Sequence, residues 1–474
     1  MASDRQGGRL KSRGREAPPN RCAPIGYLSD IYAIALALMS STWYSLLLMA
    51  QPHGLDDAAT ESPLPARPQF AYPPLERGME LPPGVNGWAR PEFRGVVRVF
   101  AFAFTRYRVG GGAACVYVDG EPVLDLWAGV SQKGEEWTRD TAPVIFSASK
   151  GVTATIIHRL VDRGLLDYRA PVARYWPEFA ANGKEAITVD GILSHTAGLS
   201  RLTGIAHNYE EMFDPDLMAD RLAAAPVDRY FGKPAYHALS IGWLMGRLAK
   251  AVTGKDLEEL YRSELAGPLG VDGIYMGRPP ADAPSQSAAL TPYLDRIARS
   301  DFIRHAAPSV MGVLDKMPGA KGAASTLYQP GAEMLLADDG HASAAVMDLR
   351  CGAGSACCTA PALAKLYAAL AGDGSVDGVR LLSPDITRGL GRKNSYRIDH
   401  TLGLPMGWHR GYHSLTAPVI GGGFGHIGAG GSFGWADQKR KISVAIVHNR
   451  LPRTMVFDQT VIGTFLPSII RAAR

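Results

Sequence analysis

The stretch "VIFSASKGVTATIIHRLVDRGLLD", residues 144–167, sets two serines beside a lysine at the start of a helical pattern. Apolar residues recur with the 3.6-residue period over Val152–Arg163, so the sequence predicts a helix that begins near Ser147. Residues three apart lie one above the other on a helix, which places Lys150 against Ser147. Ser149 has no such neighbour, because the next side chain points about 100° away. Ser147 is therefore the predicted nucleophile, at a helix start whose free N–H groups suit an oxyanion.

A Ser-x-x-Lys pair is a weak signal by itself, since a lysine near a serine is commonly a solvated surface residue. To act as a base near pH 7, Lys150 needs its pKa lowered from about 10.4 to near 7, which takes roughly 4 kcal/mol of differential stabilisation. Burial and positive neighbours supply such stabilisation, so we expect Lys150 to lie inside the protein.

Two strand pairs are predicted, one toward each end of the chain. In "ACVYVDGEPVLDLWAGV" (residues 114–130), two β-rich runs surround Asp119-Gly120, a strong hairpin signal. In "GGSFGWADQKRKISVAIVHNR" (residues 430–450), a polar turn separates two further strands. Helical patterns lie between the pairs, among them Ser240–Val252. We therefore expect an α/β (α+β) fold: an antiparallel sheet from both chain ends, flanked by helices, plus an inserted helix-rich region.

Two other serines fit catalytic patterns less well. Ser432 lies in "GGSFG" (residues 430–434), which matches the Gly-x-Ser-x-Gly elbow of α/β-hydrolases. That elbow needs a strand before the serine and a helix after it, whereas here a glycine-rich turn precedes and a hairpin follows. Ser194 stands next to His195, but adjacent residues do not face each other on a helix. The sequence favours a structural turn there.

The N-terminal residues differ in composition from the rest. Residues 1–22 carry six basic and two acidic side chains and so account for most of the formal net charge of +5. The rest of the chain is nearly neutral and does not have the basic surface that binds nucleic acid. Residues 31–50, "IYAIALALMSSTWYSLLLMA", are twenty residues without a charge, near the minimum length that spans a bilayer. One interpretation is a signal anchor or an uncleaved signal-like segment, which would place the body at a membrane or in the cell envelope. The other is a hydrophobic helix packed on the protein, or a poorly ordered upstream extension, and a cytoplasmic location is then the alternative.

A proline-rich linker follows the apolar run. Eight prolines lie between Pro52 and Pro83 without apolar periodicity. We therefore divide the chain into residues 1–52 (basic tail and apolar segment), 53–84 (linker) and 85–474 (catalytic domain). The five cysteines lack paired spacing for zinc, and no phosphate loop, zinc-binding helix or dinucleotide fingerprint occurs, so neither a metal nor a cofactor is expected. One disulfide stays open if the body is exported.

Three motifs resemble those of the serine β-lactamase and penicillin-binding-protein superfamily. They are "SASK" at residues 147–150, "YHA" at 236–238 and "GHIGAGG" at 425–431, in the order and approximate spacing of that superfamily. Within it the chain is similar to the family VIII carboxylesterases, in particular actinobacterial and mycobacterial members, from about Val85 to the C-terminus. The resemblance implies a β-lactamase-like serine hydrolase that cleaves carboxylic esters through an acyl-enzyme.

The resemblance also assigns roles to single residues. It makes Ser147 the nucleophile, Lys150 its proton acceptor, and Tyr236 the group that passes the proton to the leaving alcohol. It makes the backbone N–H groups of Ser147 and Ala429 the oxyanion hole, where loss of one donor costs about 10² to 10³ in rate.

The substrate-binding positions depart from the β-lactamase pattern. His426 and Gly428 are the expected substrate-binding residues, but a lysine usually stands at the first of these positions, and an asparagine usually stands where this chain has Ala238. An imidazole is a poorer anchor for a carboxylate than a lysine is. Both departures favour a small-molecule ester or lipid substrate. The enzymatic alternatives are a β-lactamase, a D-Ala-D-Ala peptidase or an acyltransferase, and a non-catalytic penicillin-binding or sensor protein is the alternative of another class.

Overall fold

The computed structural model describes residues 78–105, 110–132, 134–208, 210–292, 341–403, 405–414, 422–451 and 458–474. The basic tail, the apolar run 31–50 and residues 53–77 of the linker lie outside these residues, so the anchor stays a prediction. The chain divides into Met1–Pro73 and Pro74–Arg474, and all described residues belong to the second unit. In that described part, no helix is long and apolar enough to cross a bilayer.

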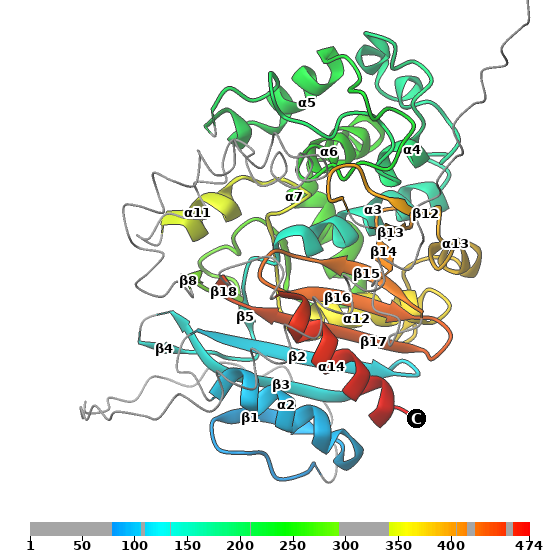
Figure 1. The fold of residues 1–474 in the computed structure, drawn as a ribbon. Helices are drawn as coiled ribbons and strands as arrows, with labels where there is room; N and C mark the ends of the chain where they lie inside the picture. Colours follow the sequence, from blue (N-terminus) through cyan, green and yellow to red (C-terminus); the bar gives the residue numbers. More distant parts are fainter. Residues whose placement is uncertain are drawn as a thin grey trace, which may run out of the picture. The chain divides into compact units, whose positions relative to one another are not determined.

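An antiparallel sheet built from both chain ends forms the centre of the second unit (Figure 1). Its strand order is β1-β3-β2-β17-β16-β15-β14-β13-β12, with β4 paired to β3. The strands are β1 Val85–Ala89, β2 Gly111–Val118, β3 Glu121–Gln132, β4 Glu135–Glu136, β12 Ser395–Ile398, β13 Pro405–Trp408, β14 His413–Ser414, β15 Phe424–Ile427, β16 Phe433–Asp437 and β17 Ile442–His448. The N-terminal β2 pairs with the C-terminal β17, so the predicted sheet is confirmed.

Both predicted hairpins form. Asp119 and Gly120 have φ values of 50° and 83°, the backbone that a two-residue turn between β2 and β3 requires. Between β16 and β17, Asp437 pairs with Ile442, and Lys441 takes a φ of 52°.

Helices and short ladders fill the chain between these hairpins. The helices are α2 Arg94–Thr105, α3 Ser149–Asp162, α4 Val189–Leu193, α5 Pro215–Ala224, α6 Ser240–Thr253, α7 Leu257–Leu260, α8 Gly267–Leu269, α11 His341–Asp348, α12 Ala360–Ala371, α13 Pro384–Leu390 and α14 Asp458–Ala472. The 3₁₀ helices are η1 Pro91–Phe93, η2 Phe146–Ala148, η3 Val172–Arg174, η4 Pro177–Ala180 and η5 Glu210–Phe213, and η6 Tyr261–Ala266 is a π-helix. The ladders pair β5 Thr141–Ala142 with β7 Gln286–Ser287, β6 Ile274–Met276 with β9 Ala356–Cys358, β8 Thr291–Pro292 with β18 Arg450–Leu451, and β10 Ser375–Val376 with β11 Val379–Arg380.

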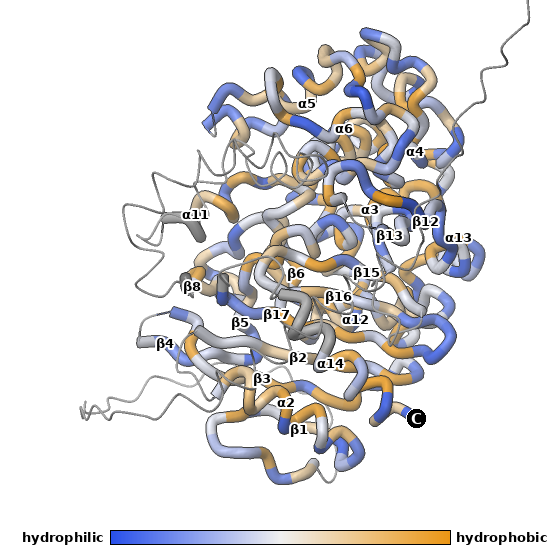
Figure 2. Tube along the Cα trace, viewed as in Figure 1, coloured by the Kyte–Doolittle hydropathy of each residue, from blue (hydrophilic) through white to orange (hydrophobic). Residues whose placement is uncertain are grey.

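Helices cover both faces of the sheet. On one face, α2 and α14 share a core with strand residues such as Val116 and Val444. On the other, α3 and α12 share a core with the alternating residues, such as Tyr117 and Ala445. Figure 2 shows α2 as strongly apolar and the outer helix α13 as hydrophilic. The central strands are therefore buried on both faces, and α3, which follows the predicted nucleophile, is held inside the protein.

The described cysteines are buried free thiols: Cys115, Cys351, Cys357 and Cys358. Cys22 lies outside the described residues. The disulfide left open from the sequence is therefore not formed among these four.

Candidate active site

Ser147 lies at the junction between the sheet and α3. It is the middle residue of η2, and α3 begins two residues later. The N–H of Ile145 donates to Ala356 O of β9 at 2.9 Å, which ties this junction to the neighbouring ladder. Phe146 takes a φ of 48°, a left-handed value that L side chains rarely adopt. The Ser147 side chain is left half-buried, so a substrate can reach it.

Lys150 lies one turn further along, as the sequence predicts. Its Nζ donates to Ser147 Oγ at 3.0 Å and to the carbonyl oxygen of Ala353 at 2.9 Å. The side chain is fully buried, and among the described residues it forms no ion pair with a carboxylate. Burial lowers the pKa of Lys150 to about 7. Near neutral pH, a large fraction of this amine is thus able to accept a proton.

Tyr236 reaches the same serine from the loop before α6. Its hydroxyl donates to Ser147 Oγ at 2.9 Å, and Lys150 Nζ lies 4.9 Å from the centre of its ring. Burial raises the pKa of Tyr236 above its ordinary value of 10, so the phenol keeps its proton. The structure therefore brings Ser147, Lys150 and Tyr236 together.

Asp399 fixes the position of Tyr236, a role that the sequence did not predict. Its Oδ1 accepts from the backbone N–H of Tyr236 at 3.1 Å, and its Oδ2 accepts from Trp408 Nε1 at 3.0 Å. Two further backbone N–H groups, of Thr401 and Leu402, donate to Oδ1 at 2.9 Å. The Trp408 ring in turn stacks on Tyr236, with centroids 5.5 Å apart and planes 9° apart. This buried carboxylate thus holds both the tyrosine and its stacking partner.

Neutral histidines surround Tyr236. The ring centroids of His195 and His426 lie 5.1 and 6.2 Å from that of Tyr236, and His413 lies 4.6 Å from His426. Burial lowers the pKa of His413 to about 4, and those of His195 and His426 well below 6.5. His195 was interpreted from the sequence as part of a structural turn. It does follow α4 with a φ of 59°, but its ring also forms a wall of the site.

His426 presents a buried hydrogen-bond acceptor beside the tyrosine. Its Nδ1 is 2.9 Å from Ile427 O, which can only accept, so Nδ1 carries the proton. Nε2 is then an acceptor, and it has no partner among the described residues. The site thus contains a buried acceptor that lacks a hydrogen-bond donor.

The turn after β15 packs directly on the nucleophile junction. A Cβ on Gly428 would lie 2.1 Å from the carbonyl oxygen of Ile145, so only glycine fits this approach. Ala429 packs against the small cluster that contains Phe146. In the described part of the chain, the N–H groups of Ser147 and Ala429 have no acceptor. The oxyanion hole itself stays a prediction.

The three other serines considered in the sequence form hydrogen bonds away from Lys150 and Tyr236. Ser149 Oγ accepts from Ala356 N at 3.0 Å and is fully buried. Ser432 Oγ accepts from His448 N at 3.1 Å, which links the turn before β16 to β17. Ser194 Oγ accepts from Asn394 Nδ2 at 2.5 Å. None of these hydroxyls is hydrogen-bonded to Lys150 or Tyr236.

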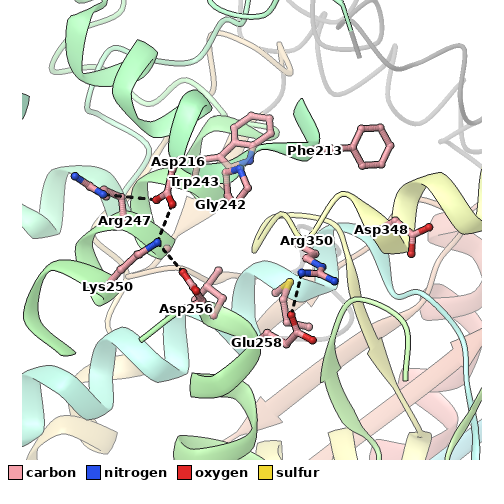
Figure 3. Close-up of a pocket in the computed structure, with 14 residues that line it drawn as sticks. Phe213, Asp216, Gly242, Trp243, Arg247, Lys250, Asp256, Glu258, Asp348 and Arg350 are labelled. Atoms are coloured by element: carbon pink, nitrogen blue, oxygen red, sulfur yellow. Dashed lines mark hydrogen bonds and ion pairs between the residues drawn. The ribbon is translucent and has the colours of Figure 1, made fainter. Parts of the chain in front are cut away.

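A separate pocket of about 330 Å³ lies along α6 (Figure 3). Its charged lining is largely neutralised by the ion pairs Asp216–Arg247, Asp216–Lys250, Asp256–Lys250 and Glu258–Arg350. The loop that binds Lys150 contains Cys351 and Ala353. Gly242 lines the pocket and lies against this loop, because a Cβ on Gly242 would be 2.6 Å from Cys351 Sγ. The pocket thus lies behind the loop that holds Lys150, and none of the predicted catalytic residues lines it. Across the described residues, no cluster of three or more metal-ligating side chains occurs.

Known proteins match most of this chain. The Beta-lactamase family model matches residues 51–462. The esterase/beta-lactamase LipL of Mycobacterium tuberculosis H37Rv is 45% identical over 377 residues, which cover 78% of this chain and 84% of LipL. Esterase EstB of Burkholderia gladioli is 31% identical over 191 residues, 36% of this chain and 48% of EstB.

Solved structures give the same result. The crystal structure of a family VIII carboxylesterase is similar with a TM-score of 0.69 and 29% identity, covering 82% of this chain and 99% of that one. A penicillin-binding protein homologue from Caulobacter crescentus has a TM-score of 0.65 and 27% identity, with the same coverage. The chain therefore belongs to the Beta-lactamase family.

Proposed function

We propose that the protein is a serine carboxylesterase that works through an acyl-enzyme. One observation carries the proposal: Ser147 Oγ accepts hydrogen bonds from both Lys150 Nζ and the Tyr236 hydroxyl, at 3.0 and 2.9 Å. Because burial lowers the pKa of Lys150 to about 7, a proton acceptor and a proton donor meet at one nucleophilic oxygen.

In the acylation half, neutral Lys150 takes the proton of Ser147 as Oγ attacks the ester carbonyl carbon. The carbonyl oxygen becomes an oxyanion, which the N–H groups of Ser147 and Ala429 stabilise. The bond to the leaving alkoxide then breaks. Tyr236 gives that alkoxide a proton and regains one from Lys150, so the amine is neutral again.

In the deacylation half, a water molecule repeats the sequence in reverse. It loses a proton to Lys150, its oxygen adds to the acyl carbon, and Ser147 Oγ leaves with a proton restored through Tyr236. The products are a carboxylic acid and the free enzyme, and no cofactor takes part in this scheme.

The names of the relatives support an ester as the substrate. LipL is named an esterase/beta-lactamase, EstB an esterase, and one similar structure a family VIII carboxylesterase. The double name of LipL makes β-lactam hydrolysis the second candidate function.

The test measures hydrolysis of p-nitrophenyl butyrate beside that of nitrocefin by the purified full chain. We expect sustained turnover of the ester, and an acylated Ser147 peptide by mass spectrometry after rapid quenching. Ser147→Ala should abolish turnover. Ser149→Ala and Ser432→Ala serve as controls and should keep a good part of it, although each loses a buried hydrogen bond. A folded Ser147→Ala protein that still hydrolyses the ester would exclude the mechanism, and a single stoichiometric burst would favour a penicillin-binding protein.

A further inference from the structure

A surface with both apolar and basic side chains lies next to the Tyr236 loop. It is formed by residues 229–234 and 391–400, the second of which includes the edge strand β12 (Figure 1). The two segments are joined: the Tyr230 and His400 rings stack with centroids 5.1 Å apart, and His400 N donates to Pro234 O at 2.9 Å. We call this surface the β12 face.

Large apolar side chains stand out from the β12 face. Phe231, Tyr396 and Ile398 are 45%, 63% and 59% exposed, and they make up three of the six large hydrophobic residues exposed in the described chain. Burial of such side chains in an apolar phase is favourable by about 25 cal/mol per Å². A concentration of them on one surface indicates an interaction site.

The same face is strongly basic. Its exposed cations are Arg229, Lys233, Arg392, Lys393 and Arg397, and none of them forms an ion pair within the described residues. The sole carboxylate in the two segments is Asp399, which is buried and accepts the four N–H groups described above. Two carboxylates from outside the segments also touch the face: Asp190, which is paired with Arg410, accepts from Asn394 Nδ2 at 3.2 Å, and Asp228 accepts from Tyr230 N at 2.8 Å. The five exposed cations therefore keep an excess of positive charge.

An open pocket of about 440 Å³ lies in the middle of the face, lined in part by Gly232, Ser395 and Arg397. Ser395 Oγ is buried and has no hydrogen-bond partner among the described residues, so this hydroxyl lacks a partner at the edge of the pocket.

We propose that the β12 face docks on bilayers that contain anionic phospholipids. Basic residues near such a surface each contribute about 1 kcal/mol, while neighbouring aromatic and aliphatic side chains enter the interface. Phe231 and Tyr396 have rings that can stack on bases, but Ile398 has none, whereas all three side chains can enter a lipid interface, so a bilayer fits the face better.

The docked orientation would place the site next to the lipid. Asp399 lies between Ile398 and His400 in the sequence and binds the backbone of Tyr236. Docking itself does not depend on the proposed ester hydrolysis. Delivery of a lipid ester to Ser147 does depend on it.

Hydrogen exchange of the full chain, read by mass spectrometry, tests docking segment by segment and needs no turnover. We expect phosphatidylglycerol vesicles to slow amide exchange in residues 391–400 by at least about fivefold, the effect of 1 kcal/mol, and phosphatidylcholine vesicles to leave it unchanged. Peptides from α2 should show no change. Because exchange is measured separately for each peptide, protection of residues 391–400 is distinguished from any lipid binding by residues 1–50, which are present in every sample.

A pair of matched variants completes the test. Tyr396→Ser with Arg397→Glu should raise the lipid concentration needed for half protection at least about tenfold. Arg98→Glu with Phe102→Ser removes the same kinds of exposed side chain from α2 and should leave it unchanged. Circular dichroism melting shows whether each variant is folded. Unprotected residues 391–400 in the natural sequence, equal protection by phosphatidylcholine, or equal protection by poly(U) would each overturn the proposal.

Discussion

At the scale of single residues, the central feature is a buried amine without a carboxylate. Lys150 Nζ has a serine hydroxyl and a backbone carbonyl as its partners, and no carboxylate of the described residues forms an ion pair with it, so burial outweighs the small opposing effect of Cys351 on its pKa. A carboxylate at either position would raise the pKa instead and remove the base. The proposed chemistry therefore depends on the absence of a carboxylate beside Lys150 as much as on the residues that touch it.

The pH dependence of ester hydrolysis follows from this amine. Because burial lowers the pKa of Lys150 to about 7 and the neutral form is the base, kcat/KM should rise about tenfold per pH unit below 7 and level off above it. Lys150→Arg should lose about 10² to 10⁴ in kcat, since a guanidinium keeps its proton. The measurement is a pH–rate profile from pH 5 to 9. A flat profile would contradict the assignment of Lys150 as base.

The same amine links pH to stability. The unfolded chain keeps the lysine protonated up to about pH 10, whereas the folded chain releases that proton near pH 7. Between these limits the unfolded state binds more protons, so the contribution of Lys150 to the free energy of unfolding rises with pH.

Substrate preference follows from His426 and Ala238. Neither supplies the charged anchor or the amide that a β-lactam would use, and each such hydrogen bond is worth roughly 1.5 to 3 kcal/mol. We expect kcat/KM for a short p-nitrophenyl ester to exceed that for a cephalosporin by at least about tenfold, and His426→Lys to narrow the ratio. His207→Lys, at a side chain 65% exposed, controls for the added charge. Faster hydrolysis of the cephalosporin by the natural sequence would refute the argument.

At the scale of elements, the turn after β15 and the 3₁₀ helix η2 act as a unit. Their backbones approach so closely at Gly428 that a side chain has no room. Gly428→Ala must push the turn away from Ser147, and we expect kcat/KM to fall at least about tenfold, as for a displaced oxyanion donor. Gly389→Ala in α13, where nothing lies within 4 Å of the new Cβ, is the matched control and should keep full activity. Steady-state kinetics measures kcat/KM for both variants, and their melting curves show whether each is folded. An unchanged kcat/KM for Gly428→Ala would contradict the prediction.

Element patterns also explain what the sequence could and could not predict. The hairpins, α3, and the Ser147–Lys150 contact were predictable because each rests on a local period or turn. The role of Asp399 was not predictable, because Asp399 and Tyr236 are 163 residues apart in the sequence and no local pattern indicates their contact. Tyr236 itself was identified only through resemblance to a family. Ala353, whose carbonyl binds Lys150, left no signal in the sequence because any residue type supplies a carbonyl.

At the scale of the whole molecule, segments from the two chain ends form one core. Phe100 of α2 and Phe465 of α14 meet edge to face, with centroids 6.4 Å apart, above the central strands. Residues before β1 join in: Met79 and Leu81 pack on this core, and Met79 N donates to Ala89 O at 3.2 Å. Met79 and Leu81, which lie within the predicted linker, thus contact this core, and the boundary at Val85 stays a prediction.

Shortened chains test where the folded unit begins. A chain that starts at Pro74 should melt like the full protein and keep its ester hydrolysis, because every contact described here remains. A chain that starts at Val85 should melt a few degrees lower, since it loses about 1 to 3 kcal/mol of apolar burial. Calorimetry compares the two chains directly. Equal melting temperatures would mean that residues 74–84 add nothing to stability, in agreement with a boundary at Val85.

The pairing of β2 with β17 has a consequence for synthesis on the ribosome. Gly111 N and the Asn449 side chain that accepts its hydrogen bond are 338 residues apart in the sequence. The hairpin of β2 and β3 is translated first, yet the neighbour that closes its open edge follows only after more than 300 further residues. Throughout elongation, the nascent chain therefore exposes an unpaired strand edge, the kind of surface that chaperones shield from aggregation. A ribosome that stalls before β17 leaves a polypeptide without the strand that joins β2 to β16, so the sheet can be completed only after β17 has been translated.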